Sequence, residues 1–138
     1  MRTAAQILAE SRTIAVVGAS RNPDKVAHTV PRQILRHGWH VIPVNPFADE
    51  IWGQTCYHSL ADIPEPVDLV NVFRPSADTP RVARAAVAIG AKALWLQQGI
   101  ASAEARAIAE AAGLDYVEDH CIAVERALSQ LSLIGGTP

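Results

Sequence analysis

Short apolar segments alternate along the chain with segments of helical periodicity, and this alternation constrains the fold more than any other feature. The apolar segments are rich in Val, Ile and Leu, as is typical of strands buried on both faces of a sheet. They comprise residues 13–17, 40–44, 68–73, 93–96 and 114–117. Strands that alternate with helices form βαβ units, in which the strands are parallel and the crossovers are right-handed.

Apolar residues at helical spacing occupy the intervals between these strands. The expected helices are residues 4–11, 28–37, 77–89, 102–113 and 122–133. Pro31 fits only the first turn of its helix, because proline has no N–H to donate from a helix interior. Ser102 has the hydroxyl of an N-cap, and Gly113 is a stop signal. We therefore predict an α/β fold: a Rossmann-like three-layer sandwich with a mostly parallel sheet of about five strands.

The size and composition indicate one folded domain over residues 1–138, with a core at about 12–133 and a frayed tail at 135–138. A net charge of −2 gives no strong field that would favour binding to nucleic acid or to an anionic membrane. We read no signal peptide and no membrane span. Cys56 and Cys121 lack the spacing of a disulfide framework, so we expect a cytoplasmic protein. A homodimer through an exposed helix or an edge strand stays open.

Small and polar residues follow the predicted strands where a core would need neither. These loops are residues 18–23, 44–46, 73–75 and 97–99. Ligands of open α/β sheets bind beyond the carboxyl ends of the strands, near the point where the strand order reverses. The four loops are therefore the candidate binding region.

The first loop has the properties of a phosphate cradle. Gly18 allows a tight turn, and we expect the N–H groups of residues 18–22 to open toward solvent and to bind a diphosphate. Arg21 and Lys25 add positive charge nearby. A plain strand-to-helix turn is an equally good interpretation of this loop alone.

Two departures argue against a conventional NAD site. Ser20 and Pro23 occupy the positions of the second and third glycines of the dinucleotide pattern. Asn45 stands where an acidic residue would bind the ribose 2′-OH. No GxxxxGK[ST] loop for a nucleoside triphosphate is present in the sequence.

Five segments together resemble the small CoA-binding protein family, whose fold is similar to the nucleotide-binding domain of the succinyl-CoA synthetase α subunit. In order, they read TIAVVGAS, HVIPVNP, EPVDLVNVFR, GAKALWLQQGI and LDYVEDHC. The resemblance runs from about residue 4 to residue 131. Five motifs in the same order are more specific than any one of them.

The resemblance implies coenzyme A as the ligand and assigns its contacts segment by segment. The first loop would face the phosphates, with charge from Arg21 and Lys25. Residues 44–46 would flank adenine and ribose, residues 73–74 would form a wall, and residues 97–99 would border the pantetheine arm. The implied cofactor-binding residues are Gly18, Ala19, Ser20, Arg21, Asn22, Lys25, Val44, Asn45, Pro46, Phe73, Arg74, Gln97, Gln98 and Gly99.

Two positions depart from the family pattern. Phe47 follows the Asn-Pro pair, where a basic residue is common, and it could stack on adenine instead. His120 precedes the late cysteine, where a basic residue is also common.

Residues outside these loops give weaker signals. His28 lies close to the first loop and would contact a phosphate if its side chain faced that way. Cys121 follows Glu118-Asp119-His120, which we interpret as a polar turn in preference to a reactive thiol. We expect Cys56 and Trp95 in the core. Trp52 could cover the first loop or lie at an interface with another protein, and the sequence does not distinguish these two roles.

The sequence predicts a non-catalytic module that binds coenzyme A or acyl-CoA. The resemblance covers only the CoA domain of the synthetase, so we expect this chain to bind CoA and do not expect ligase activity. The first alternative is an enzyme, either a Rossmann-type oxidoreductase or a CoA-thioester enzyme using Cys121. The second alternative is an interaction domain whose pocket is vestigial.

Overall fold

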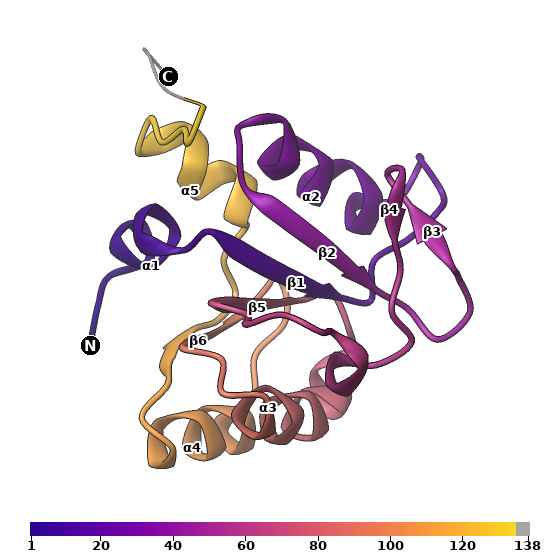
Figure 1. The fold of residues 1–138 in the computed structure, drawn as a ribbon. Coiled ribbons are helices and arrows are strands. Elements are labelled where there is room, and N and C mark those ends of the chain that lie inside the picture. The colour runs from indigo at the N-terminus through magenta and orange to yellow at the C-terminus, as the bar shows by residue number, and fades with distance from the viewer. Residues whose placement is uncertain (135–138) are drawn as a thin grey trace.

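A parallel sheet forms the centre of the computed structural model, which describes residues 1–134, so the predicted frayed tail at 135–138 lies outside it. The strand order β2-β1-β5-β6-β7 confirms the predicted Rossmann-like α/β fold (Figure 1). The strands are β1 (Thr13–Val17), β2 (His40–Val44), β5 (Leu69–Val72), β6 (Ala93–Leu96) and β7 (Asp115–Val117).

The register brings the carboxyl ends of three strands to one level. Val17 of β1 pairs with Val44 of β2 on one side and with Val72 of β5 on the other. The chain runs from β1 outward to β2, and then returns past β1 to form β5. The strand order therefore reverses between β1 and β5, which is where doubly wound sheets bind ligands.

Helices cover both faces of the sheet and complete the three layers (Figure 1). One face is covered by α1 (Ala4–Glu10), α2 (Val26–Arg36) and α5 (Ile122–Leu128). The other is covered by α3 (Thr79–Ala88) and α4 (Ala103–Ala111). Within residues 1–134, every helix is too short or too polar to cross a membrane.

The start of α2 corrects the expectation that Pro31 lies in the first turn. The helix begins at Val26, so Pro31 lies in its interior. Proline has no N–H to donate to the carbonyl of Ala27, four residues earlier. The N–H of Ser20 donates to that carbonyl at 3.1 Å. Pro31 thus leaves an acceptor free, and this acceptor holds the first loop against the helix.

A small antiparallel hairpin, which the sequence did not predict, follows β2. It consists of β3 (Glu50–Ile51) and β4 (Gln54–Thr55), and φ is positive at both turn residues, Trp52 and Gly53. Two positive φ values are typical of a tight hairpin turn. The Trp52 indole N–H donates to the carbonyl of His28 at 3.0 Å. Trp52 therefore packs against α2 at His28.

Two core predictions are confirmed. Trp95 is 0% exposed and Cys56 is 5% exposed. Burial raises the pKa of the Cys56 thiol, because the thiolate would lose its hydration. Its Sγ lies 3.7 Å from the carbonyl oxygen of Asn45. Cys56 therefore supports the end of β2 as a protonated, weakly donating thiol.

Replacement of Gly18 by alanine should destabilise the protein more than the same change at Gly113. Both residues have positive φ, 87° and 81°. A Cβ at Gly18 would lie 3.0 Å from the carbonyl oxygen of Phe73, whereas none of the described atoms lies within 4 Å at Gly113. We expect Gly18→Ala to cost about 1–3 kcal/mol in urea unfolding, and Gly113→Ala to cost less. Equal losses would show that the close approach to Phe73 is unimportant.

Candidate functional site

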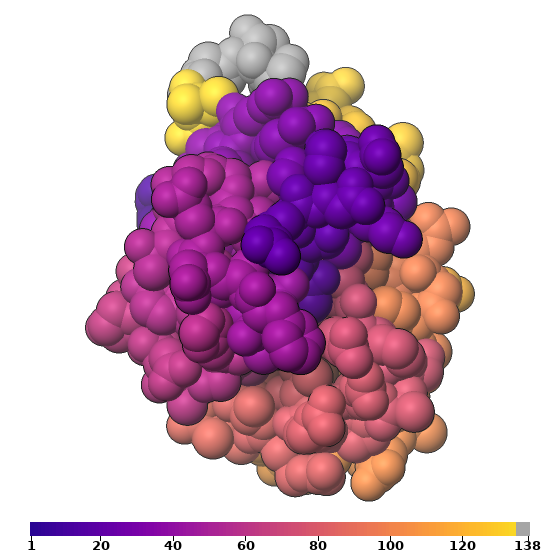
Figure 2. Space-filling view, turned by 90° about the vertical axis from the view of Figure 1, so that its right-hand side faces the viewer, coloured from indigo at the N-terminus to yellow at the C-terminus, as the bar shows by residue number. Residues whose placement is uncertain are grey.

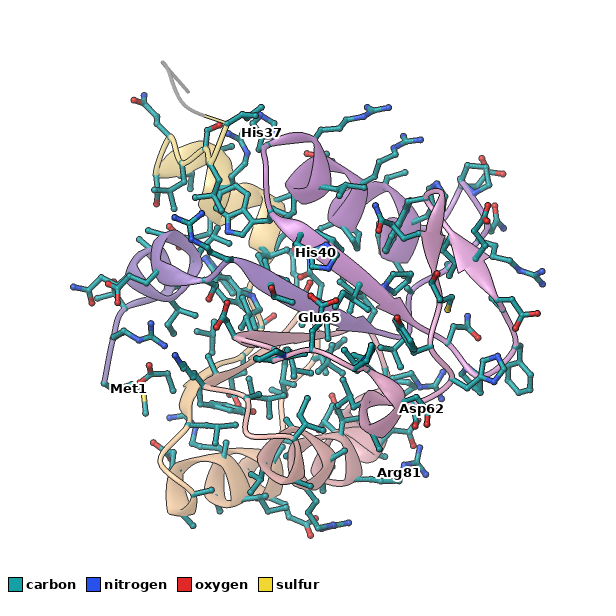
Figure 3. The ribbon with its side chains drawn as sticks, in the orientation of Figure 1. Met1, His37, His40, Asp62, Glu65 and Arg81 are labelled. Atoms are coloured by element: carbon teal, nitrogen blue, oxygen red, sulfur yellow. The ribbon has the colours of Figure 1, made fainter. Side chains whose placement is uncertain are left out.

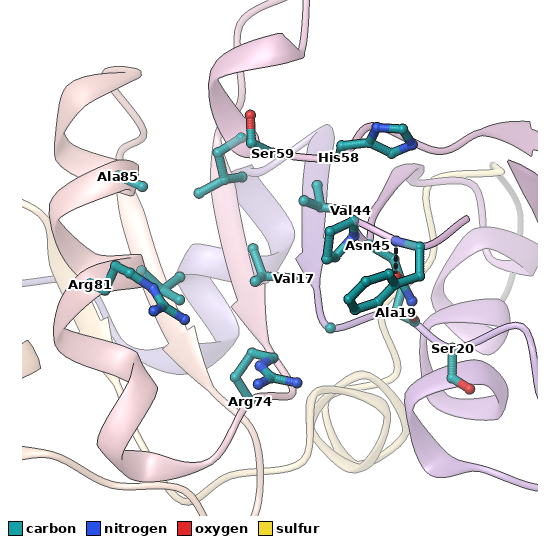
Figure 4. Close-up of a pocket in the computed structure, with 15 residues that line it drawn as sticks. Val17, Ala19, Ser20, Val44, Asn45, His58, Ser59, Arg74, Arg81 and Ala85 are labelled. Carbon is teal, nitrogen blue, oxygen red and sulfur yellow. Dashed lines mark hydrogen bonds between the residues drawn. The ribbon is translucent and has the colours of Figure 1, made fainter. Parts of the chain in front are cut away.

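A cavity of about 570 Å³ opens at the carboxyl edge of the sheet, over the ends of β1, β2 and β5. In the space-filling view from this side, the first loop, the segment after β2 and helix α3 meet around it (Figure 2). Figure 4 shows its walls at close range. The lining residues are Val17, Gly18, Ala19, Ser20, Val44, Asn45, Pro46, Phe47, His58, Ser59, Leu60, Arg74, Arg81, Val82 and Ala85.

Half of the predicted contact residues line this cavity. They are Gly18, Ala19, Ser20, Val44, Asn45, Pro46 and Arg74. Arg21, Asn22 and Lys25 are exposed farther along the first loop and do not line it. Phe73 is half-buried against the core. The roles given to these four residues stay predictions.

Residues 97–99 lie away from the cavity, at the end of β6. Gln97 is 5% exposed, and its Oε1 accepts from the Nδ2 of Asn71 at 3.4 Å and from the N–H of Ile122 at 3.3 Å. Gln97 therefore ties β5 and β6 to the start of α5. Gln98 and Gly99 are exposed, and their place beside a pantetheine arm stays a prediction.

The first loop does not present the open row of amides that the sequence suggested. The N–H of Gly18 donates to the carbonyl of Val44 at 3.1 Å, and the N–H of Ser20 donates to that of Ala27 at 3.1 Å. Both amides are therefore committed to the protein and hold the loop in place. The expectation that the amides of residues 18–22 all face solvent is wrong for these two and for Asn22, whose N–H donates to the Ser20 hydroxyl at 3.1 Å.

Three groups of the loop can still bind an anion. Among residues 1–134, the N–H groups of Ala19 and Arg21 donate no hydrogen bond to the protein. The Ser20 hydroxyl oxygen accepts from the N–H of Asn22 at 3.1 Å, which leaves its own hydrogen to donate. The loop thus offers two amides and one hydroxyl.

The Asn45 side chain joins the two loops that form one wall of the cavity. Its Nδ2 donates to the carbonyl of Ala19 at 2.8 Å, and its Oδ1 accepts from the N–H of Phe47 at 2.8 Å. Its backbone N–H donates to the carbonyl of Tyr57 at 2.9 Å. Figure 4 shows Asn45 beside Ala19 at this wall. Asn45 therefore shapes the site by holding backbone.

His28 supports the first loop from behind. Its Nδ1 lies 2.7 Å from the carbonyl oxygen of Ser20, so Nδ1 carries the hydrogen and donates it. Its ring packs against that of Trp52, with 5.9 Å between centroids. This contact holds the Ser20 carbonyl against α2, the helix that carries His28. His28 thus positions the loop, and its contact with a phosphate stays a hypothesis.

The sequence interpretation missed the wall made by helix α3 and by the chain after the hairpin. Arg81, Val82 and Ala85 come from α3, and His58 to Leu60 follow β4. Arg81 and Ala85 are one helical turn apart, so they share a face. This spacing was a usable signal, because the helix that follows β5 flanks the strand reversal.

The segment around Cys121 is organised by packing. His120 stacks on Trp95, with 5.7 Å between ring centroids, and its Nε2 lies 2.8 Å from Glu125 Oε1. Hydrogen bonds from Ser129 and then His120 lower the pKa of Glu125. Cys121 is half-buried at the start of α5 and does not line the cavity. In the part of the chain that the structure describes, no cluster of three His, Cys, Asp or Glu residues is placed to bind a metal.

Comparison with known proteins confirms the family resemblance. A family described as "CoA binding domain" matches residues 12–127. The uncharacterized protein YneT of Bacillus subtilis is 39% identical over 125 residues, which are 91% of this chain and 93% of that protein. A hypothetical protein from Pyrococcus horikoshii has a solved structure with a TM-score of 0.88 and 36% identity, covering 91% of this chain and 88% of that one.

Larger enzymes share part of the domain. An ADP-forming acetate–CoA ligase of Methanocaldococcus jannaschii is 31% identical over 71 residues. That match covers 51% of this chain and 10% of the ligase.

Replacement of Asn45 by aspartate should separate the two loops. The change keeps an acceptor for the N–H of Phe47 but removes the donor to the carbonyl of Ala19. An acceptor left without a donor costs about 1–3 kcal/mol, which urea unfolding would measure. Asn22→Asp is the matched control. The Oδ1 of Asn22 accepts a hydrogen bond from the backbone N–H of Asp24, and the new carboxylate keeps that bond. A loss no larger than that of Asn22→Asp would contradict the role given to Asn45.

Proposed function

The chain belongs to the CoA binding domain family, and from this premise we propose that it binds coenzyme A or an acyl-CoA in the cavity at the carboxyl edge of its sheet. The observation that carries the proposal is the position of the cavity, at the strand reversal between β1 and β5. The activity of the ligase relatives is not carried over, since the chain matches only a tenth of that protein.

The adenosine would occupy the part of the cavity between the end of β2 and helix α3. Val17, Val44 and Leu60 give this part an apolar floor. Apolar walls with a few polar groups are typical of sites for small molecules. The side chain of Phe47 is 85% exposed and lines the cavity. Stacking of its ring on adenine would contribute about 1–3 kcal/mol and replace the cation common at this position.

The diphosphate would bind at the first loop. The N–H of Ala19 and the hydroxyl of Ser20 lie at the cavity, and the N–H of Arg21, farther along the loop and just outside the cavity, would provide a third donor. Arg74 approaches from the end of β5, and its side-chain stem packs close to Gly18. Charge-assisted hydrogen bonds from such groups are stronger than neutral ones.

The pantetheine arm would leave the cavity past Phe73 toward residues 97–99, along the carboxyl ends of β5 and β6. This route rests on strand order, because β6 is the next strand beyond β5. It would carry the thiol toward the half-buried Cys121 at the start of α5. The imidazole of His120 is occupied by Glu125 and Trp95, which supports a binding role in preference to thiol catalysis.

Calorimetry and thermal shift with coenzyme A, acetyl-CoA, NAD and NADH test the proposal. A ligand at 100 times its Kd stabilises the native state by about 2.7 kcal/mol. We expect coenzyme A and acetyl-CoA to raise the unfolding temperature, and NAD and NADH to leave it unchanged. A shift with NADH alone would favour an oxidoreductase. No shift with any of the four compounds would favour a vestigial pocket.

Ser20→Asp should abolish the shift with coenzyme A. The new carboxylate would lie at the cavity and repel the diphosphate. Ser132→Asp is the matched control, because Ser132 contacts the carbonyl of His37, which precedes the start of β2. That contact lies at the amino ends of the strands, whereas the cavity lies at their carboxyl ends. If Ser20→Asp folded and bound coenzyme A as tightly as Ser132→Asp, the diphosphate would not lie at the first loop.

A further inference from the structure

Arg81 differs from the other basic side chains that line the cavity. His58 Nε2 lies 3.0 Å from Asp49 Oδ1, and Arg74 Nη2 lies 2.8 Å from Asp78 Oδ2. Within residues 1–134, no carboxylate lies within 4.0 Å of the Arg81 guanidinium. Among the described residues that line the cavity, Arg81 is therefore the cation that no carboxylate neutralises.

Helix α3 gives no reason for a cation at this position. Arg81 lies in the first turn of the helix, where the backbone dipole favours negative charge and disfavours positive charge. The carboxylate of Asp62, in the neighbouring 3₁₀ turn Leu60–Asp62, accepts from the hydroxyl of Ser59 at 3.1 Å and forms no ion pair with Arg81. Figure 3 shows Arg81 extending from α3 toward the carboxyl edge of the sheet. The dipole and the guanidinium together make this wall attractive to an anion.

Arg81 and Arg74 mark two separate places for negative charge. Arg74 follows β5 and lies next to Gly18 of the first loop. Arg81 lies on the same face of α3 as Ala85. Figure 4 shows Arg81 on α3 at one side of the cavity, Ala19 and Ser20 at the other, and Arg74 between them. A ligand that used both would carry one anionic group at the loop and a second against the helix.

We propose that Arg81 is a specificity-determining residue that binds a phosphate on the ribose, so that the chain distinguishes coenzyme A from dephospho-CoA. The inference rests on the proposed function. Coenzyme A carries a 5′-diphosphate and a separate 3′-phosphate, and dephospho-CoA lacks only the latter. A phosphate monoester has close to two negative charges at neutral pH, and a guanidinium can bind two of its oxygens at once.

The two ligands, measured by calorimetry on the wild type and on Arg81→Gln, test this proposal. We expect the wild type to bind coenzyme A about tenfold more tightly than dephospho-CoA, the effect of one charge-assisted contact at a partly exposed site. Arg81→Gln should bring the two affinities together by weakening only coenzyme A. Arg81→Lys should restore part of the preference, since it keeps the charge and loses the bidentate geometry.

Arg84→Gln is the matched control on the same helix. Arg84 is exposed and does not line the cavity, so this variant should keep the wild-type preference. Equal wild-type affinity for the two compounds would overturn the inference and leave coenzyme A binding intact. So would a preference that survived Arg81→Gln. Binding of neither compound by the wild type would overturn the proposed function, and the inference with it.

Discussion

The amide of Asn45 is the interaction on which the rest of the site depends. It donates to the loop after β1 and accepts from the loop after β2, while the backbone of the same residue pairs with the chain that follows the hairpin. One side chain thus sets the spacing of three segments that are distant in sequence. An acidic residue, which a dinucleotide site would have here, cannot donate to Ala19. The departure from the NAD pattern therefore has a structural reason.

The first loop divides its backbone groups between folding and binding. The amides of Gly18 and Ser20 hold the turn against β2 and α2, and His28 fixes the Ser20 carbonyl. The amides of Ala19 and Arg21 alternate with them and have no acceptor in the described chain. Hydrogen bonds at alternate amides already hold the loop rigid. The loop therefore loses little conformational entropy when a ligand binds, which favours binding.

The elements of the fold were predictable where they depend on local pattern, and much of the site was not. The strands and helices follow from hydrophobic periodicity, which acts over a few residues. The hairpin escaped prediction because its strands have two residues each and Trp52 replaces the usual Asn or Asp in the turn. Which amides of the first loop are hydrogen-bonded depends on acceptors that are distant in sequence, so it could not be predicted. Arg81 escaped prediction because its sequence context is that of any exposed arginine on a helix.

An amide-resolved NMR titration of the labelled protein with coenzyme A tests the central claim most directly. The claim is that the ligand occupies the cavity between the first loop and α3, using the amides that folding leaves free. The largest shift changes should then fall on Ala19, Arg21, Phe47 and the exposed face of α3 near Arg81. Changes confined to the far edge at β7 and α5, or none at saturating ligand, would contradict the account.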